Sequence, residues 1–125
     1  MKWPFPAVIP TLLVAGVHLI FLTVYPAYYY WNGTDVLMHT AGGAAIACIA
    51  WSIWPEKTDW RRFLAMLGFV ALVGIFWEWY EFLSDQLVGT LTQPGLADTM
   101  ADFLCDLLGA SVALMAIYVV ERPKR

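Results

Sequence analysis

The chain contains four long apolar stretches, which are separated by short polar or aromatic segments. Each stretch is close to the roughly 20 apolar residues that a helix needs to cross the hydrocarbon core of a bilayer. None of them alternates polar and apolar residues with the period of two that a half-buried strand requires. The pattern predicts an all-α fold, an integral membrane four-helix bundle in a single domain, with helices over about 7–27, 35–54, 62–85 and 97–120.

Composition agrees with a chain that lies in a membrane. Hydrophobic residues make up 61% of the sequence and charged residues only 14%, whereas a soluble domain carries about 25% charged residues. There is no run of basic residues of the kind that binds nucleic acid. We therefore expect membrane lipids as partners and no nucleic acid.

The basic residues are segregated along the chain in a way that predicts its orientation. All of them fall at the two termini or in the segment between the second and third stretches: Lys2, Lys57, Arg61, Arg62, Arg122, Lys124 and Arg125. Four spans with both termini in the cytoplasm place every one of these residues inside, as the positive-inside rule prefers. This predicts a multi-pass protein of the inner (plasma) membrane.

Acidic residues gather at the junction of the third and fourth stretches. Six carboxylates lie between residues 76 and 106 without any Lys or Arg among them: Glu78, Glu81, Asp85, Asp98, Asp102 and Asp106. An acidic residue at the centre of a membrane helix costs roughly 2.5–3.5 kcal/mol on insertion scales. Such groups must bind a cation, hold protons or face water, so they mark a functional site.

Helical spacing arranges these polar residues on shared faces. Three sets recur at intervals of three or four residues: Glu78, Glu81 and Asp85; Asp98, Asp102 and Asp106; Asp35 and His39. Small residues, such as Gly42 and Gly43 after His39, continue each stripe toward the cytoplasm. Because small residues let membrane helices approach closely, we expect a tightly packed inner half and a polar cleft in the outer half.

The residue types in this cleft predict a metal site. An imidazole and several carboxylates converging from different helices suit a divalent ion such as Zn, Mn, Fe or Mg. His39, Glu81 and Asp102 each lie about one turn from a predicted outer helix end, so they are the expected ligands, with Asp106 as a further one. Glu78 is the candidate general base.

The order of these motifs resembles that of VanZ-like membrane proteins, and it is nearest to the small bacterial inner-membrane proteins of unknown function grouped around them. The resemblance covers residues 35–113 and rests on three motifs: Asp35-x3-His39-x2-Gly42-Gly43, Glu78-x2-Glu81-x3-Asp85 and Asp98-x3-Asp102-x3-Asp106-x2-Gly109-Ala110. It implies a helical membrane fold whose polar residues are Asp35, His39, Glu78, Glu81, Asp98, Asp102 and Asp106.

Two functions of different classes fit this pattern, and whether the chain is an enzyme stays open. In the first, a metal ion in the cleft acts on a lipid or on a lipid-linked head group. In the alternative, the chain is a non-enzymatic accessory subunit of a larger membrane complex, or a homo-oligomer, that packs through its small-residue stripes.

Two further readings have less support. A proton or cation pathway requires polar groups throughout the membrane, but the acidic residues stop in the outer half. A haem held by His18 and His39 would need ligands at matching depths, and these residues differ in depth by roughly 7–8 Å at helical rise. The role of His18 stays open.

Overall fold

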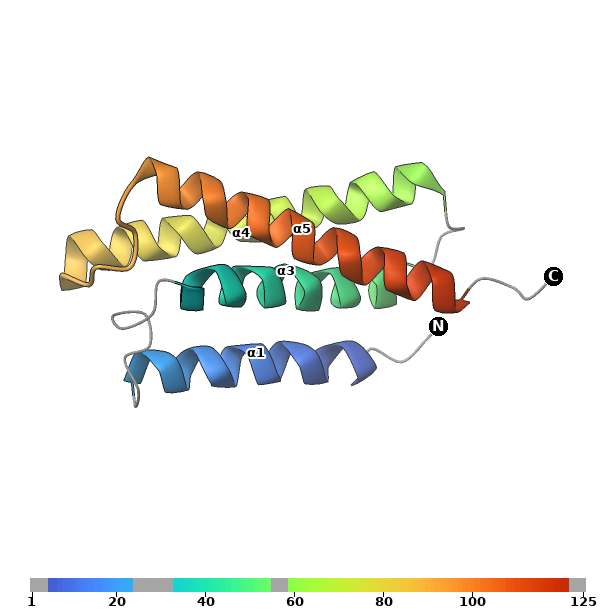
Figure 1. Cartoon of the computed structure of the whole chain (residues 1–125), viewed down its shortest axis with the longest axis horizontal. Coiled ribbons are helices and arrows are strands. Elements are labelled where there is room, and N and C mark those ends of the chain that lie inside the picture. The colour runs from blue at the N-terminus through green and yellow to red at the C-terminus, as the bar shows by residue number, and fades with distance from the viewer. Residues whose placement is uncertain (1–4, 24–32, 55–58, 122–125) are drawn as a thin grey trace.

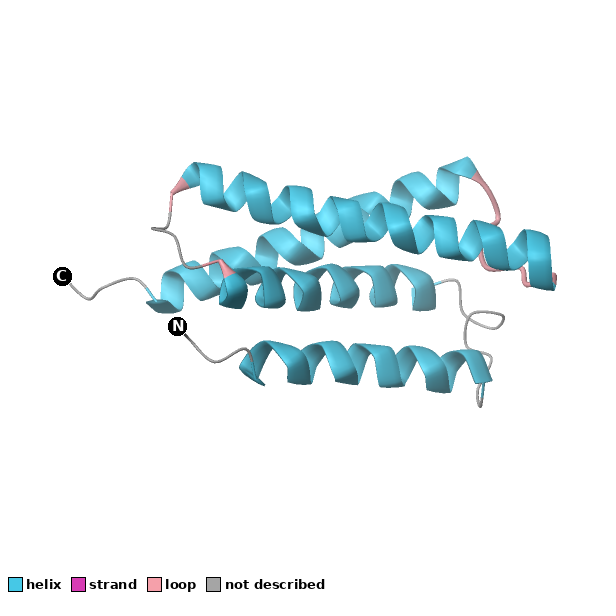
Figure 2. Ribbon diagram, turned by 180° about the vertical axis from the view of Figure 1, so that it is seen from behind, coloured by secondary structure: helices cyan, strands magenta, loops and turns pink. Residues whose placement is uncertain are grey.

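The computed structural model describes residues 5–23, 33–54 and 59–121, and the regular structure of these residues is entirely helical (Figures 1 and 2). The helices are α1 (Phe5–Thr23), α3 (Gly33–Ile53), α4 (Trp60–Val88) and α5 (Leu96–Glu121). The prediction of an all-α, four-helix membrane bundle is confirmed. Of the first predicted helix, 7–27, the last four residues lie outside the described part of the chain.

Helix α4 is longer than its apolar pattern predicts. It begins two residues earlier, where the Asp59 side chain accepts a hydrogen bond from the Arg62 backbone N–H at 2.9 Å. It ends three residues later, at Val88, and the next residue, Gly89, has a φ of 78°, the left-handed conformation that commonly terminates a helix. At 1.5 Å per residue α4 spans about 44 Å, more than the roughly 30 Å hydrocarbon core. It therefore has to tilt or extend into the interface.

Three of the helices, α3, α4 and α5, are long and apolar enough to cross a membrane. In α1 the apolar stretch is shorter and covers Thr11–Ile20. Large apolar side chains such as Leu72, Leu104 and Val112 are exposed on the outside of the bundle, which suits contact with lipid rather than water. The crossing of a bilayer by α1, as a fourth span, stays a prediction.

Helices α3 and α5 form the most extensive packing contact among the described residues, although α4 lies between them in sequence. Gly43 of α3 lies against the backbone of Asp106, and Gly109 of α5 lies against the backbone of Thr40. A Cβ atom at either glycine would overlap the carbonyl group opposite. Glycine at both positions therefore sets how closely the two helices approach.

The half of the bundle that contains the end of α3 and the start of α4 has a compact apolar core. Its members come from α3, α4 and α5, and half of them are alanines: Ala47, Ala50, Met66, Val70, Ala110 and Leu114. This agrees with the prediction of a tightly packed inner half built on small residues.

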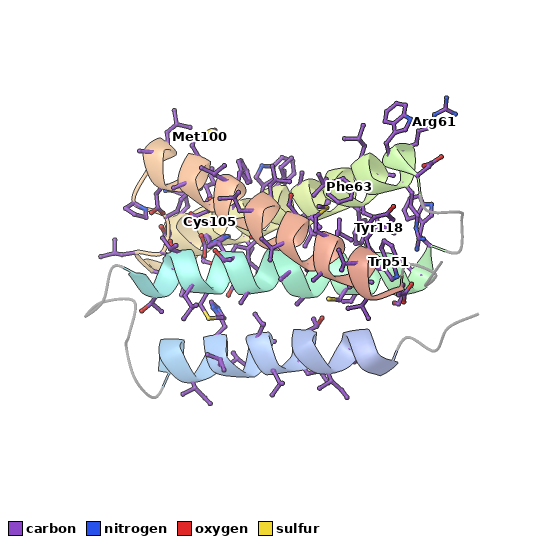
Figure 3. The ribbon with its side chains drawn as sticks, turned by 45° about the vertical axis from the view of Figure 1, so that its right-hand side comes forward. Trp51, Arg61, Phe63, Met100, Cys105 and Tyr118 are labelled. Atoms are coloured by element: carbon purple, nitrogen blue, oxygen red, sulfur yellow. The ribbon has the colours of Figure 1, made fainter. Side chains whose placement is uncertain are left out.

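Arg62 lies at the end of the bundle where α3 ends and α4 begins, and its contacts connect α3, α4 and α5. Its guanidinium donates to the carbonyl oxygens of Trp51 at 3.0 Å and Trp54 at 2.6 Å, and it lies 4.1 Å from the centre of the Trp51 ring. The Trp51 indole N–H in turn donates to Glu121 at 3.2 Å. Figure 3 shows Trp51 and Arg61 at this end and Met100 at the opposite end. We call the two ends the basic end and the acidic end.

Helix α1 forms a separate layer on α3, on the side away from α5 (Figures 1 and 2). Among the described residues its backbone closely approaches α3 alone. It reaches α4 through the side chain of His18, whose ring meets the Trp77 ring edge-on at 5.0 Å between centroids. Helix α1 thus lies on one side of α3, and α4 and α5 lie on the other (Figures 1 and 2).

Candidate metal-binding site

The start of α3, the end of α4 and the start of α5 meet at the acidic end (Figure 1). Six polar residues come together there, and we call them the acidic cluster: Asp35, His39, Glu78, Glu81, Asp102 and Asp106. All except the half-buried Asp35 are at most 7% exposed. The four carboxylates of α4 and α5 thus face the interior of the bundle rather than lipid, as their helical spacing predicts.

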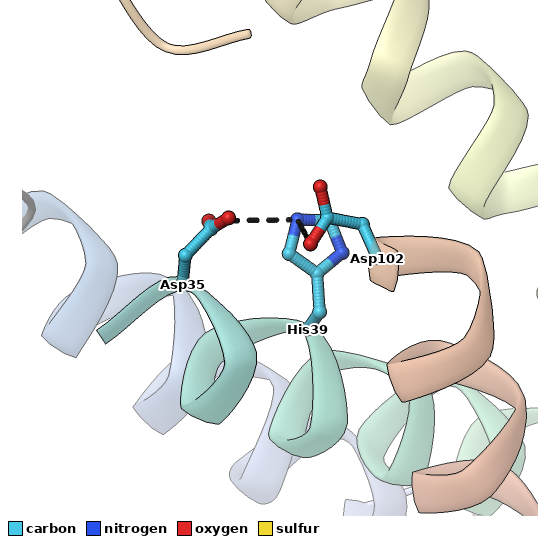
Figure 4. A group of neighbouring side chains, drawn as sticks. All are labelled: Asp35, His39 and Asp102. Carbon is cyan, nitrogen blue, oxygen red and sulfur yellow. Dashed lines mark ion pairs between the residues drawn. The ribbon is translucent and has the colours of Figure 1, made fainter. Parts of the chain in front are cut away.

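His39 occupies the centre of the cluster and has a different partner on each ring nitrogen. Its Nδ1 atom lies 3.3 Å from Asp106 Oδ1. Its Nε2 atom lies 3.8 Å from Asp35 Oδ1 and 3.8 Å from Asp102 Oδ1, and these two carboxylates flank it in Figure 4. In the tautomer that carries its proton on Nδ1, His39 donates to Asp106 and turns the Nε2 lone pair toward the other two acids. Metal-binding histidines commonly have this carboxylate behind the imidazole.

The spacing of the donor atoms fits a metal ion. Two groups, Asp35–His39–Asp102 and His39–Glu78–Glu81, each have donor atoms within 4.8 Å of one another. Ligands at the usual 2.0–2.2 Å from zinc lie at most about 4.4 Å apart. The 3.8 Å separations around Nε2 are inside this limit.

Some buried carboxylate oxygens at the acidic end have no hydrogen-bond partner among the described residues. Asp102 Oδ2 and Glu78 Oε1 are buried and accept no hydrogen bond within the described ranges, and the same holds for Asp98 Oδ2 nearby. No Lys or Arg occurs in the sequence between Arg62 and Arg122 to pair with them. Because an unpaired buried carboxylate is strongly unfavourable, these oxygens favour a cation, a proton or a ligand as their partner.

Neighbouring side chains hold the two glutamates in place. The Trp77 indole N–H donates to Glu81 Oε1 at 2.9 Å. The Gln93 amide donates to Glu78 Oε2 at 3.2 Å and also lies 3.1 Å from Thr99 Oγ1. Trp77 is half-buried, and its spacing of four residues from Glu81 is the signal for this contact in the sequence. Nothing in the sequence pattern indicates Gln93.

Asp85 shares a helical face with Glu78 and Glu81, but its hydrogen bonds are to the loop that follows α4. It accepts hydrogen bonds from the Thr90 hydroxyl at 2.5 Å and from the backbone N–H groups of Thr92 and Gln93 at 2.9 Å each. These contacts fold the loop between α4 and α5 back onto α4. Asp85 is therefore a loop-organising residue, and one result of its contacts is the position of Gln93 over Glu78.

The structure rearranges the expected ligand set. Glu81 and Asp102 each lie near His39 but belong to different donor groups. Asp106 approaches Nδ1, on the other side of the imidazole ring from Asp102. Asp35, which was not among the expected ligands, lies with His39 and Asp102 in one donor group. The arrangement offers an oxygen-rich site with one nitrogen ligand, close to one end of the membrane-spanning helices.

A family model described as Predicted membrane protein (DUF2238) matches residues 2–123 of the chain. The chain belongs to the DUF2238 family. A relative from Thermotoga maritima, named Uncharacterized protein, is 31% identical over 104 residues, which cover 78% of this chain and 53% of that protein. The chain thus spans about half the length of this curated relative. No solved structure matches the chain.

Membership of the DUF2238 family agrees with the helical membrane fold. The match runs through all four helices and therefore includes the whole acidic cluster. Neither the family description nor the name of the relative states a substrate or a reaction. The resemblance to VanZ-like proteins is a separate prediction that the DUF2238 match does not test. Function has to be argued from the site.

Proposed function

We propose that this protein binds a divalent metal ion at the acidic cluster and uses it to act on the head group of a lipid or lipid-linked molecule. One observation carries the proposal. The buried Nε2 atom of His39 faces carboxylates from two helices, and one of them, Asp102, has a buried oxygen without a partner in the described part of the chain. A metal ion bound there would satisfy all three groups.

The charges of the proposed ligands support a divalent ion. When both are ionised, Asp35 and Asp102 together carry two negative charges, and the neutral imidazole of His39 adds none, so one divalent ion would neutralise the set. A mixture of imidazole and carboxylate ligands suits Zn, Mn or Fe better than Mg, which prefers oxygen alone. Asp106 contributes by accepting the Nδ1 proton of His39, which orients the ring.

The proposed chemistry divides between the metal and the protein. When bound, the ion polarises a phosphoryl or acyl oxygen and supplies the positive charge that the outer half of the chain lacks. Glu78 is the proposed general base because its Oε1 atom has no described partner while Gln93 holds its Oε2 atom. In this role Glu78 takes a proton from an attacking water molecule. The surrounding burial keeps other water away from the site.

Metal analysis of the detergent-purified protein tests the proposal. The unmodified protein should contain a near-stoichiometric amount of a divalent metal, and Asp102→Asn should contain almost none. Glu121→Gln is the matched control, since it also removes a carboxylate from α5 but at the basic end, where its oxygen can still accept from Trp51. If the protein retains no metal after purification and binds none on titration, the proposal is wrong. The carboxylates would then be protonated partners within the bundle, and the accessory-subunit alternative would gain support.

A further inference from the structure

A cavity of about 440 Å³ opens from the acidic cluster and lies between α1, α3 and α4. Its volume falls within the range of about 300–1,000 Å³ typical of small-molecule sites. The polar end is lined by Asp35, His39, Glu81 and Asp106. Away from that end the walls are mainly apolar, with Val14 from α1, Met38 and Ile46 from α3, and Val70 and Val73 from α4, although Thr11 and His18 of α1 also line the cavity. A ligand that fits both parts must have a polar end and an apolar tail.

The cavity follows the helix axes toward the centre of the bundle. Its α3 wall extends from Asp35 to Ile46, which corresponds to about 16 Å at 1.5 Å per residue. This is about half of the roughly 30 Å thickness of the hydrocarbon core. A hydrocarbon chain lying along this wall would have its polar end at the level of the acidic cluster and its tail at the level of the apolar core.

Two features keep this space open. Gly42 lines the cavity, and a Cβ atom added there would meet nothing within 4 Å, so any larger side chain would project into free volume. Helix α1 makes close backbone contact with α3 alone among the described helices, and its His18 ring contacts the Trp77 ring of α4. The cavity therefore lies between α1 and α4, with α3 as its third wall.

The polar end combines two kinds of recognition chemistry. Asp35, His39 and Asp102 form the proposed metal site, which attracts phosphate. Glu81 is not needed for that set, and it lies at the cavity beside Trp77 and Tyr80, whose rings are 5.4 Å apart. A carboxylate with aromatic rings nearby suits an ammonium group, which is attracted both to the negative charge and to the rings.

We propose that the cavity binds one chain of a phospholipid whose head group carries an amine, with the phosphate toward the metal and the ammonium group toward Glu81, Trp77 and Tyr80. This inference rests on the proposed function and names its substrate class. It accounts for an apolar cavity that ends at an acidic cluster, and for the absence of Lys and Arg from the sequence between Arg62 and Arg122.

The test is native mass spectrometry of the full chain in detergent with added phosphatidylethanolamine or phosphatidylglycerol. The unmodified protein should retain one phosphatidylethanolamine molecule and less phosphatidylglycerol, and a chelator should reduce retention of both. Gly42→Leu fills the cavity and should lower retention about tenfold, which corresponds to about 1.4 kcal/mol. Gly68→Leu is the matched control, because Gly68 also has nothing within 4 Å of an added Cβ but does not line the cavity.

The outcomes separate this inference from the proposed function. Equal retention by Gly42→Leu and Gly68→Leu, with metal still bound to both, would overturn the lipid site and leave the metal site standing. Equal retention of the two lipids would overturn the amine-bearing head group as the ligand. Retention that depends on Gly42 in a protein that binds no metal would refute the proposed function while confirming that the cavity holds a lipid chain.

Discussion

The acids around His39 fall into two groups, according to which ring nitrogen they approach. Asp106 lies at hydrogen-bonding distance from Nδ1, at 3.3 Å, whereas Asp35 and Asp102 are 3.8 Å from Nε2. A separation of 3.8 Å is too long for a direct hydrogen bond but suits two ligands of one ion. At this scale, removal of Asp106 and removal of Asp102 should therefore have different consequences.

Replacing each aspartate with asparagine tests this division. Asp102→Asn should abolish binding of Zn²⁺ or Mn²⁺, because it removes a ligand and its charge. Asp106→Asn should weaken the affinity 10–100-fold, the usual effect of losing the carboxylate behind a metal-binding histidine. Isothermal titration calorimetry in detergent measures both, with Glu121→Gln as the control. Equal, complete losses in the two variants would instead make Asp106 a ligand.

The dependence of metal binding on pH has a definite sign. Protons compete with the metal for carboxylate and imidazole ligands, so affinity falls as the pH falls. At a hundredfold excess of metal over the dissociation constant the ion stabilises the fold by about 2.7 kcal/mol. We expect the metal-induced rise in melting temperature to be largest near pH 8 and to disappear toward pH 5. Asp102→Asn should show no metal-induced rise at any pH. A rise that is independent of pH would argue against these ligands.

Sequence spacing predicts the direction in which the site residues face but not their exact partners. The intervals between Glu78, Glu81, Asp102 and Asp106 place them on inward faces, and the structure agrees. The contact of Gln93 with Glu78 depends on a loop whose shape is set by hydrogen bonds to Asp85. A loop has no helical period from which such a contact could be predicted.

At the scale of whole helices, the crossing of α3 and α5 positions the site. Gly43 and Gly109 let the two backbones touch within a few residues of His39, Asp102 and Asp106. The sequence pattern predicts small-residue stripes on three helices, but it does not indicate that α3 pairs chiefly with α5. Similar small residues also occur on α4, where Gly74 faces the Asp106 carboxylate.

An added methyl group at the crossing should separate the helices. In Gly109→Ala the new Cβ meets the backbone of Thr40, and overpacking of this kind costs typically 1–3 kcal/mol. We expect a lower melting temperature and weaker metal binding, because Asp102 and Asp106 would move away from His39. Gly68→Ala has free space around its Cβ and should be neutral or stabilising by up to about 1 kcal/mol. Thermal unfolding in detergent compares the two, and identical melting temperatures would exclude a tight crossing.

At the scale of the whole molecule, charge segregation matches the arrangement of the helices. The start of α1, the start of α4 and the end of α5 share one end of the bundle, and the acidic cluster lies at the other (Figure 1). Hydropathy and the distribution of Lys and Arg predict this layout, because each acts on a whole segment. They do not predict that α1 packs on α3, since an apolar helix can bury any of several similar faces.

Labelling of single cysteines tests the predicted orientation. In a background with Cys48 and Cys105 changed to Ser, Leu91→Cys and Trp60→Cys place a thiol at the acidic and basic ends, where these positions are 97% and 67% exposed. A membrane-impermeant maleimide added to intact spheroplasts should label the cysteine at 91 alone. Labelling of the cysteine at 60 under the same conditions would place the acidic cluster in the cytoplasm.

The close partnership of α3 and α5 also bears on how the protein is made. Helix α3 leaves the ribosome well before α5, with Asp35 and His39 already in place and its glycine face still uncovered. At the usual synthesis rate of 5–20 residues per second, Gly109 follows Gly43 after on the order of 3–13 s. For most of this interval Asp35 and His39 lack the acidic partners that α5 supplies, and α5 does not yet cover the glycine face of α3. The acidic cluster, and with it the proposed metal site, cannot assemble until α5 has been synthesised, because Asp102 and Asp106 belong to that helix.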